Sequence, residues 1–112
     1  MFEELERRLR DILARRAPGY VELFNIYCMI HYHLDCLVLL FKEPSKLYHI
    51  ILTHYRGDVV TSNYVFTLIF LGPLAQLLGD YSVVKSLLEL AKMGKDQEFL
   101  EVIKRRIKRH EA

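Results

Sequence analysis

The sequence predicts an all-α fold: a single compact domain over residues 1–112, with about six helices in a bundle-like or orthogonal array that self-associates. Apolar residues recur at steps of three and four near both ends of the chain, as they do in amphipathic helices. Glycine and proline separate segments of helical length, and the chain contains neither Asn-Gly nor Asp-Gly, the commonest short hairpin turns. Hydrophobic residues make up 52% and charged residues 27% of the sequence, which excludes an intrinsically disordered chain.

The first helix is predicted from an apolar stripe with glutamate and arginine between its members, and Pro18-Gly19 ends it. The stripe comprises Phe2, Leu5, Leu9, Ile12 and Leu13. A long helix from about Tyr20 to Phe41 follows, apolar on nearly every side, as expected for the central helix of a bundle. Pro44 then opens a third helix, because proline suits the first helical turn, and Gly57 closes it.

The segment Val59–Leu71 is rich in residues that favour strands as readily as buried helices. We expect a helix there, since no hairpin partner elsewhere in the chain completes a sheet. Gly72-Pro73 is expected to break or kink this helix, because proline lacks the amide donor. A short helical turn over 74–78 then stops at Gly79.

Two helices are predicted in the C-terminal third of the chain. Ser82 begins the first and Gly94 ends it, at the positions where such caps are usual. Asp96 caps the second helix, whose last turns are rich in lysine and arginine. Cations near the end of a helix also suit its dipole.

Formal charges concentrate at the two ends of the chain. Residues 17–91 carry four Lys or Arg and six acidic residues, whereas residues 92–112 carry seven and four. A middle so poor in charge must be largely buried, yet a domain of this size buries only ~65% of the surface of its unfolded chain. We therefore expect another polypeptide to cover the remaining apolar surface: a second copy, as a dimer or larger species, or a different protein subunit.

No secretory signal is predicted, because the first eight residues are rich in charge. The apolar segment Tyr20–Phe41 is broken by Glu22, Asn25, His31, His33 and Asp35. Each of these residues makes insertion into a bilayer costly, so we expect no membrane span and no membrane partner.

Cys28 and Cys36 are predicted to be reduced thiols of a cytoplasmic protein. On one helix they lie about 12 Å apart at ~1.5 Å per residue, beyond the reach of a disulfide. Asn and Gln together number only four, whereas Lys, Arg and Glu are plentiful. That bias is typical of proteins from hot-growing organisms.

Cys28, His31 and Asp35 fall on one face of the predicted long helix, within about 60° of one another at ~100° per residue. A thiolate, an imidazole and a carboxylate can bind zinc, with a fourth ligand such as His49 or His54 from the next helix. No pair has the Cys-x-x-Cys spacing of a zinc ribbon, and a histidine and an aspartate one turn apart commonly form a hydrogen-bonded pair. We therefore expect neither a metal ion nor a cofactor.

Residues 74–88 resemble a helix-turn-helix, the DNA-binding family whose second helix lies in the major groove. Ala75, the turn glycine Gly79 and the helix after it carry the resemblance. The resemblance implies a sequence-specific DNA-binding regulator. Its reading face would comprise Ser82, Lys85, Ser86 and Glu89.

Arg105 and His110 fit the Arg-x4–6-His pattern of the HEPN family of small all-helical dimers, which the last helix resembles. The resemblance implies a ribonuclease. His110 would then act as general acid or base on a ribose hydroxyl, while Arg105 stabilises the charge on the phosphate.

The last helix carries the only strong concentration of charge in the sequence. This basic cluster comprises Lys104, Arg105, Arg106, Lys108 and Arg109. One interpretation is a solubilising face whose charges pair with Asp96, Glu98 and Glu101. The other is a surface that binds the phosphates of DNA or RNA, together with Lys85. The five arginines of residues 1–16 would extend that surface if the two terminal helices pack side by side.

No phosphate-binding glycine loop, nucleophile elbow, paired-carboxylate motif or dinucleotide fingerprint occurs in the sequence, so an enzyme is disfavoured. The sequence predicts a small, homo-oligomeric accessory or interaction protein. Its basic last helix would allow it to act as a subunit or regulator in a nucleic-acid-associated complex. A helix-turn-helix regulator and a HEPN-like ribonuclease are the alternatives.

Overall fold

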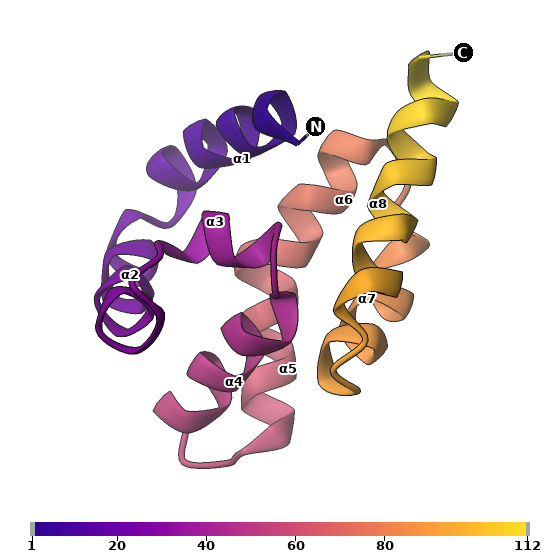
Figure 1. Ribbon diagram of the computed structural model, residues 1–112. Helices are drawn as coiled ribbons and strands as arrows, with labels where there is room; N and C mark the ends of the chain where they lie inside the picture. Colours follow the sequence, from indigo (N-terminus) through magenta and orange to yellow (C-terminus); the bar gives the residue numbers. More distant parts are fainter. Residues whose placement is uncertain (1, 112) are drawn as a thin grey trace.

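The longest element of the structure is a helix that runs without a break from Val59 to Leu78 (Figure 1). This central helix consists of α5 (Val59–Phe66), a π-helical turn η1 (Thr67–Leu71) and α6 (Gly72–Leu78). The computed structural model describes residues 2–111, with side chains described for residues 2–108. No strand occurs in residues 2–111, so the predicted all-α class and the predicted helix over 59–71 are confirmed.

The other helices pack around the central helix. They are α1 (Glu3–Arg16), α2 (Pro18–Tyr32), α3 (Cys36–Leu40), α4 (Pro44–His54), α7 (Val83–Lys92) and α8 (Asp96–Glu111). α1 packs against α6, α4 against α5 and α7 against η1, while α2 contacts α1, α3 and α4. α6 contacts both α1 and α8 and lies between them (Figure 1), so the two terminal helices are held apart.

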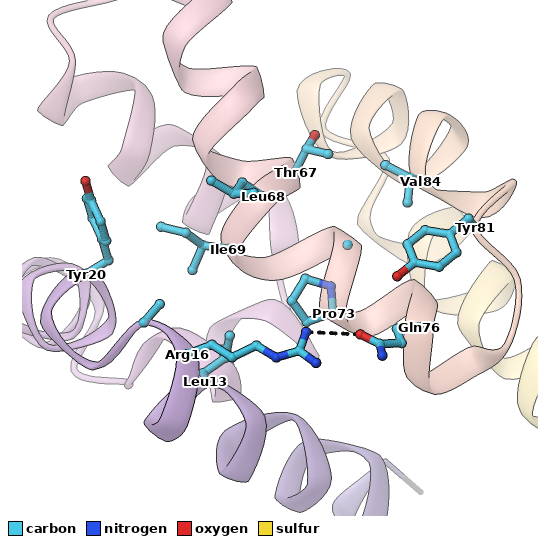
Figure 2. Close-up of a pocket in the computed structure, with 12 residues that line it drawn as sticks. Leu13, Arg16, Tyr20, Thr67, Leu68, Ile69, Pro73, Gln76, Tyr81 and Val84 are labelled. Carbon is cyan, nitrogen blue, oxygen red and sulfur yellow. Dashed lines mark hydrogen bonds between the residues drawn. The ribbon is translucent and has the colours of Figure 1, made fainter.

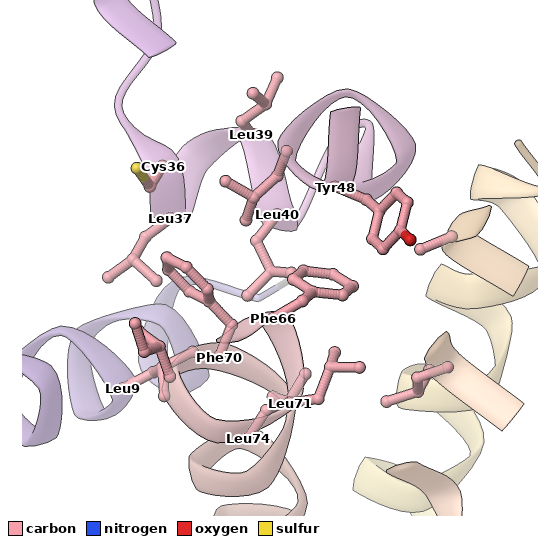
Figure 3. Close-up of a cluster of buried hydrophobic side chains, with 14 of the residues drawn as sticks. Leu9, Cys36, Leu37, Leu39, Leu40, Tyr48, Phe66, Phe70, Leu71 and Leu74 are labelled. Atoms are coloured by element: carbon pink, nitrogen blue, oxygen red, sulfur yellow. The ribbon is translucent and has the colours of Figure 1, made fainter. Parts of the chain in front are cut away.

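The hydrophobic core surrounds the middle of the central helix (Figure 3). Phe66, Phe70, Leu71 and Leu74 of the central helix are fully buried. In Figure 3 the two phenylalanines lie beside Leu37 and Leu40 of α3, and Leu9 of α1 lies near Phe70. Burial of each such side chain contributes ~1.5–3 kcal/mol to folding, so tertiary packing fixes the position of the central helix.

Pro73 explains the π-helical turn in the central helix. Proline has no amide hydrogen, and in a regular helix its ring clashes with the carbonyl group four residues earlier. The chain accommodates proline with one wider turn, in which the amide of Gly72 donates to the carbonyl oxygen of Thr67, five residues earlier. The helix therefore continues through Gly72-Pro73 instead of breaking there.

The segment Val59–Leu78 is long and apolar enough, by length and composition alone, to cross a membrane. Its mean hydropathy reaches 1.3, and 44% of that apolar window is buried within the protein. The core helix of a globular protein passes the same test. In this structure the segment packs against helices on several sides, as a core helix does.

The predicted single helix over Tyr20–Phe41 is wrong, because the chain turns at His33, whose backbone is left-handed with a φ of 59°. Asp35 then caps α3, since its Oδ1 accepts a hydrogen bond of 3.0 Å from the backbone amide of Val38. The Oδ1 of Asn25 accepts a bond of 2.8 Å from the first amide of α3. These two side chains together end one helix and begin the next.

This turn brings Cys28 and Cys36 into contact. Their sulfur atoms lie 3.4 Å apart and both side chains are fully buried, so the predicted separation beyond disulfide reach is wrong. The hydrogen bond to Cys28, together with burial, raises the pKa of the Cys36 thiol well above its usual range. Cys36 therefore stays protonated, and one of the two thiols donates a hydrogen bond to the sulfur of the other.

Asp96, predicted to cap the last helix, is the first residue of α8. It accepts hydrogen bonds of 2.9 Å from both the backbone amide and the hydroxyl of Ser45. Because Ser45 lies in the first turn of α4, the carboxylate stabilises the start of α4 and ties it to α8.

The predicted turn glycines Gly57, Gly79 and Gly94 all have positive φ, which confirms these positions.

The two helical glycines Gly19 and Gly72 are expected to respond in opposite ways to substitution by alanine. A Cβ at Gly19 meets no atom within 4 Å, so Gly19→Ala should stabilise the fold by about 0.4–1 kcal/mol. A Cβ at Gly72 lies 3.1 Å from the backbone oxygen of Thr67, so Gly72→Ala should destabilise by ~1 kcal/mol or more. Urea unfolding followed by circular dichroism measures both, and a Gly72→Ala variant as stable as Gly19→Ala would contradict the tight packing at η1.

Oxidation is expected to join Cys28 and Cys36 within one molecule. When local opening of the fold exposes the buried pair, a thiolate attacks a small disulfide such as oxidised glutathione. The second thiol then displaces the glutathione thiolate, so two electrons and two protons leave the protein. The intact mass should fall by about 2 Da, the two hydrogens lost in this exchange. The matched variant Cys36→Ser should stop at the mixed disulfide. A disulfide-linked pair of chains, in place of the intramolecular product, would show that the two sulfurs do not meet.

Candidate functional site

An apolar groove lies along the central helix where α1, α2 and α7 approach it (Figure 2). Its volume is about 680 Å³. It is lined by Leu13, Arg16, Ala17, Tyr20, Thr67, Leu68, Ile69, Gly72, Pro73, Gln76, Tyr81 and Val84. The π-helical turn therefore forms part of the groove, and such turns are frequent at functional sites.

Tyrosines and one arginine are the notable polar groups of the groove. Tyr20 and Tyr81 flank it in Figure 2 and are 53% and 65% exposed. Arg16 is the only charged side chain in the lining, and its Nη1 donates a hydrogen bond of 3.1 Å to Oε1 of Gln76. The lining combines many apolar side chains with few polar groups, as surfaces that bind a ligand or a partner do.

An apolar ridge borders the groove on the same helix. The ridge comprises Val60, Tyr64 and Leu68, which lie one turn apart and are 80%, 65% and 59% exposed. The sequence has no charged residue between Asp58 and Asp80, so the ridge has no charged neighbour on its own helix. Exposed apolar surface of this kind marks sites of interaction.

Two of the predicted phosphate-binding residues form ion pairs within the chain. Nη1 of Arg106 lies 3.2 Å from Oδ2 of Asp80, and Nζ of Lys104 lies 4.0 Å from Oε1 of Glu101. The glutamate is one of the partners expected from the sequence, whereas Asp80 comes from the connection between α6 and α7. These contacts reduce the positive charge that α8 presents to solvent.

The remaining basic residues are more accessible. Lys85, Arg105 and Lys108 are exposed and have no ion pair within the described part of the chain, while the side chain of Arg109 lies outside it. A polar pocket of about 450 Å³ between α7 and α8 is lined by Ser82, Val83, Ser86, Val102, Arg105 and Arg106. The arginines of α1 do not extend this surface, because α6 separates α1 from α8.

The two segments that resemble known families both contribute residues to the polar pocket between α7 and α8. The helix-turn-helix-like segment comprises α6, the turn at Gly79 and α7, and its expected reading face of Ser82, Lys85, Ser86 and Glu89 is exposed. α6 is not a separate helix, since it continues directly from η1. Of the HEPN-like pair, Arg105 lines the polar pocket, and the side chain of His110 lies outside the described residues.

The three residues first considered as metal ligands, Cys28, His31 and Asp35, are not brought together. Cys28 is buried beside Cys36, whereas Asp35 caps α3 and accepts a bond of 3.2 Å from Arg10. His31 is exposed, with its ring beside that of a neighbouring tyrosine. Among the described residues, no three His, Cys, Asp or Glu side chains are placed to hold one metal ion.

The chain matches no family model, no curated protein and no solved structure. The geometry of its own surfaces is therefore the basis on which a function can be proposed. Sequence reasoning missed Tyr64, Leu68 and Pro73 as site residues, because apolar residues on a central helix are usually core. The one signal for them was the uncharged run over residues 59–79.

Proposed function

We propose that this chain is a non-enzymatic helical interaction protein that forms a homodimer through the groove and the ridge. The observation that carries the proposal is that groove and ridge lie on the same helix and share Leu68. In a two-fold symmetric interface the same patch of both copies meets. A hollow and a protrusion on one patch suit this symmetry, because the ridge of each copy can then fill the groove of the other.

The composition of this patch suits a second copy of the chain. Arg16, the charged residue of the groove, is exposed and donates a hydrogen bond to Gln76, so at the rim of the interface its guanidinium can keep its contact with water. The rings of Tyr20 and Tyr81 add apolar area, and their hydroxyls can keep hydrogen bonds at the rim. A standard interface takes ~800 Å² from each partner, a modest part of this chain's 6576 Å² of accessible surface.

The unmodified chain is expected to have twice the mass of its 13.3 kDa monomer in light scattering at micromolar concentration. Leu68→Glu and Tyr64→Glu should each produce monomers, because the interface would then bury an unpaired carboxylate. Both side chains are largely exposed in the monomer, so helicity and melting temperature should change little.

Met93→Glu is the matched control, since Met93 is 60% exposed but lies at the opposite end of α7 from the groove residue Val84. That variant should remain dimeric. A wild-type chain that stays monomeric at ~100 µM, a concentration at which a micromolar interface is formed, refutes the proposal.

Contact with nucleic acid is a second role, supported by the exposed cations of α8. Arg105 and Lys108 are available to phosphates, and Arg105 and Arg106 border a pocket that also has the hydroxyls of Ser82 and Ser86. Dimerisation would double this charge. The role implied is that of an accessory subunit on DNA or RNA, held through phosphates without sequence preference.

The double variant Arg105→Gln/Lys108→Gln is expected to weaken binding of single-stranded RNA and duplex DNA, as measured by filter binding at 50 and 250 mM salt. The slope of log affinity against log salt should fall by about 1 for each lost phosphate contact. The control Arg8→Gln/Arg15→Gln removes the same charge from exposed positions of α1 and should have a smaller effect. Equal losses in both double variants, or no binding by the wild type at 50 mM salt, would argue against a site on α8.

A further inference from the structure

A second hollow, between α2 and α4, has a composition unlike that of the groove. Its volume is about 370 Å³, within the ~300–1,000 Å³ range of small-molecule sites. It is lined by Tyr27, His31, Tyr32, His49, Ile50, Thr53, His54 and Arg56. It shares no lining residue with the groove, so a ligand can occupy it whether or not the chain dimerises.

The polar groups of this hollow are mostly hydrogen-bond donors or cations. Three of the five histidines of the chain line it, together with Arg56, and no aspartate or glutamate does. Lys46 adds charge at its edge, since its Nζ lies 5.0 Å from the centre of the Tyr32 ring, although it also pairs with Glu43. Because the lining has one guanidinium and three imidazoles but no carboxylate, an anion is the ligand it favours.

Aromatic rings give the hollow flat, preorganised walls. The ring of His54 is held by three others: Phe24 at 5.6 Å, Tyr27 at 5.5 Å and Tyr55 at 4.8 Å between centres. The ring of Tyr32 lies beside that of His31, 6.4 Å away. Such faces suit a planar ligand, because aromatic groups stack on one another.

Arg56 supplies a permanent positive charge and has an unusual backbone. Its φ is 55°, a left-handed conformation that few residues other than glycine and asparagine adopt readily. The guanidinium has no hydrogen bond or ion pair within the described part of the chain. The adjacent amides of Tyr55, Arg56 and Gly57 already bond to the last carbonyls of α4, so the side chain is not needed to cap that helix.

We propose that this hollow binds a planar aromatic anion of the nucleoside monophosphate type. Arg56 and the imidazoles of His49 and His54 would contact the phosphate, and the rings of Tyr27 and Tyr32 would contact the base. The three imidazoles are not placed to hold one metal ion. Each imidazole can instead donate one N–H to the anion, and Nε2 of His49 also lies 3.5 Å from the hydroxyl of Thr53.

The test is calorimetric titration of the full-length chain with adenosine 5′-monophosphate, with adenosine and with inorganic phosphate. The nucleotide should bind with a dissociation constant below about 1 mM, an affinity that small ligands of this size reach. Adenosine and phosphate should each bind at least tenfold more weakly. Equal affinity for phosphate would overturn the aromatic part of the assignment, and equal affinity for adenosine would overturn the anionic part.

Arg56→Asn removes the charge but keeps a residue that tolerates the left-handed backbone, so this variant should fold. Its affinity for the nucleotide should fall at least tenfold while its weak binding of adenosine stays the same. Arg15→Gln, at an exposed position of α1, removes the same charge elsewhere and should bind like the wild type. No saturation with nucleotide up to 10 mM, or an Arg56→Asn variant that binds as the wild type does, overturns the proposal.

Discussion

The structure depends on one constraint: residues 59–79 carry no charge and have to be covered by the rest of a chain of only 112 residues. As a helix this segment satisfies its own backbone hydrogen bonds and can turn Phe66, Phe70 and Leu74 into the core. The helices α1, α4, α7 and α8 contact it, but they cover only part of its circumference. The face that stays exposed carries the ridge, so the same segment that organises the core also creates the surface proposed to bind a second copy.

Most helices could be predicted from local signals, whereas the change of direction at His33 could not. Apolar residues continue on both sides of that turn, so periodicity alone favoured one long helix. Asp35 offered a cap signal, but the first amide of α3 bonds to Asn25 of the preceding helix, a contact that local sequence patterns do not reveal. The contact between Cys28 and Cys36 results from this turn, so it could not be predicted from the sequence either.

The candidate sites differ in how far the sequence could reveal them. The cations of α8 were visible as a cluster, although the pairing of Arg106 with Asp80 depends on how α8 packs beside the α6–α7 connection. The groove could not be predicted from the sequence, since four separate segments build it and the π-helical turn before Pro73 contributes to its lining. The hollow at Arg56 likewise needs α2 and α4 side by side before its histidines share one space.

The proposed dimer is tested most directly by an isotope-filtered nuclear Overhauser experiment on a mixture of carbon-13-labelled and unlabelled chains. The proposed interface predicts cross-peaks between the methyl groups of Leu68 in a labelled copy and ring protons of Tyr20 or Tyr81 in an unlabelled one. A dimer whose Leu68 methyls show only contacts within their own chain would contradict it.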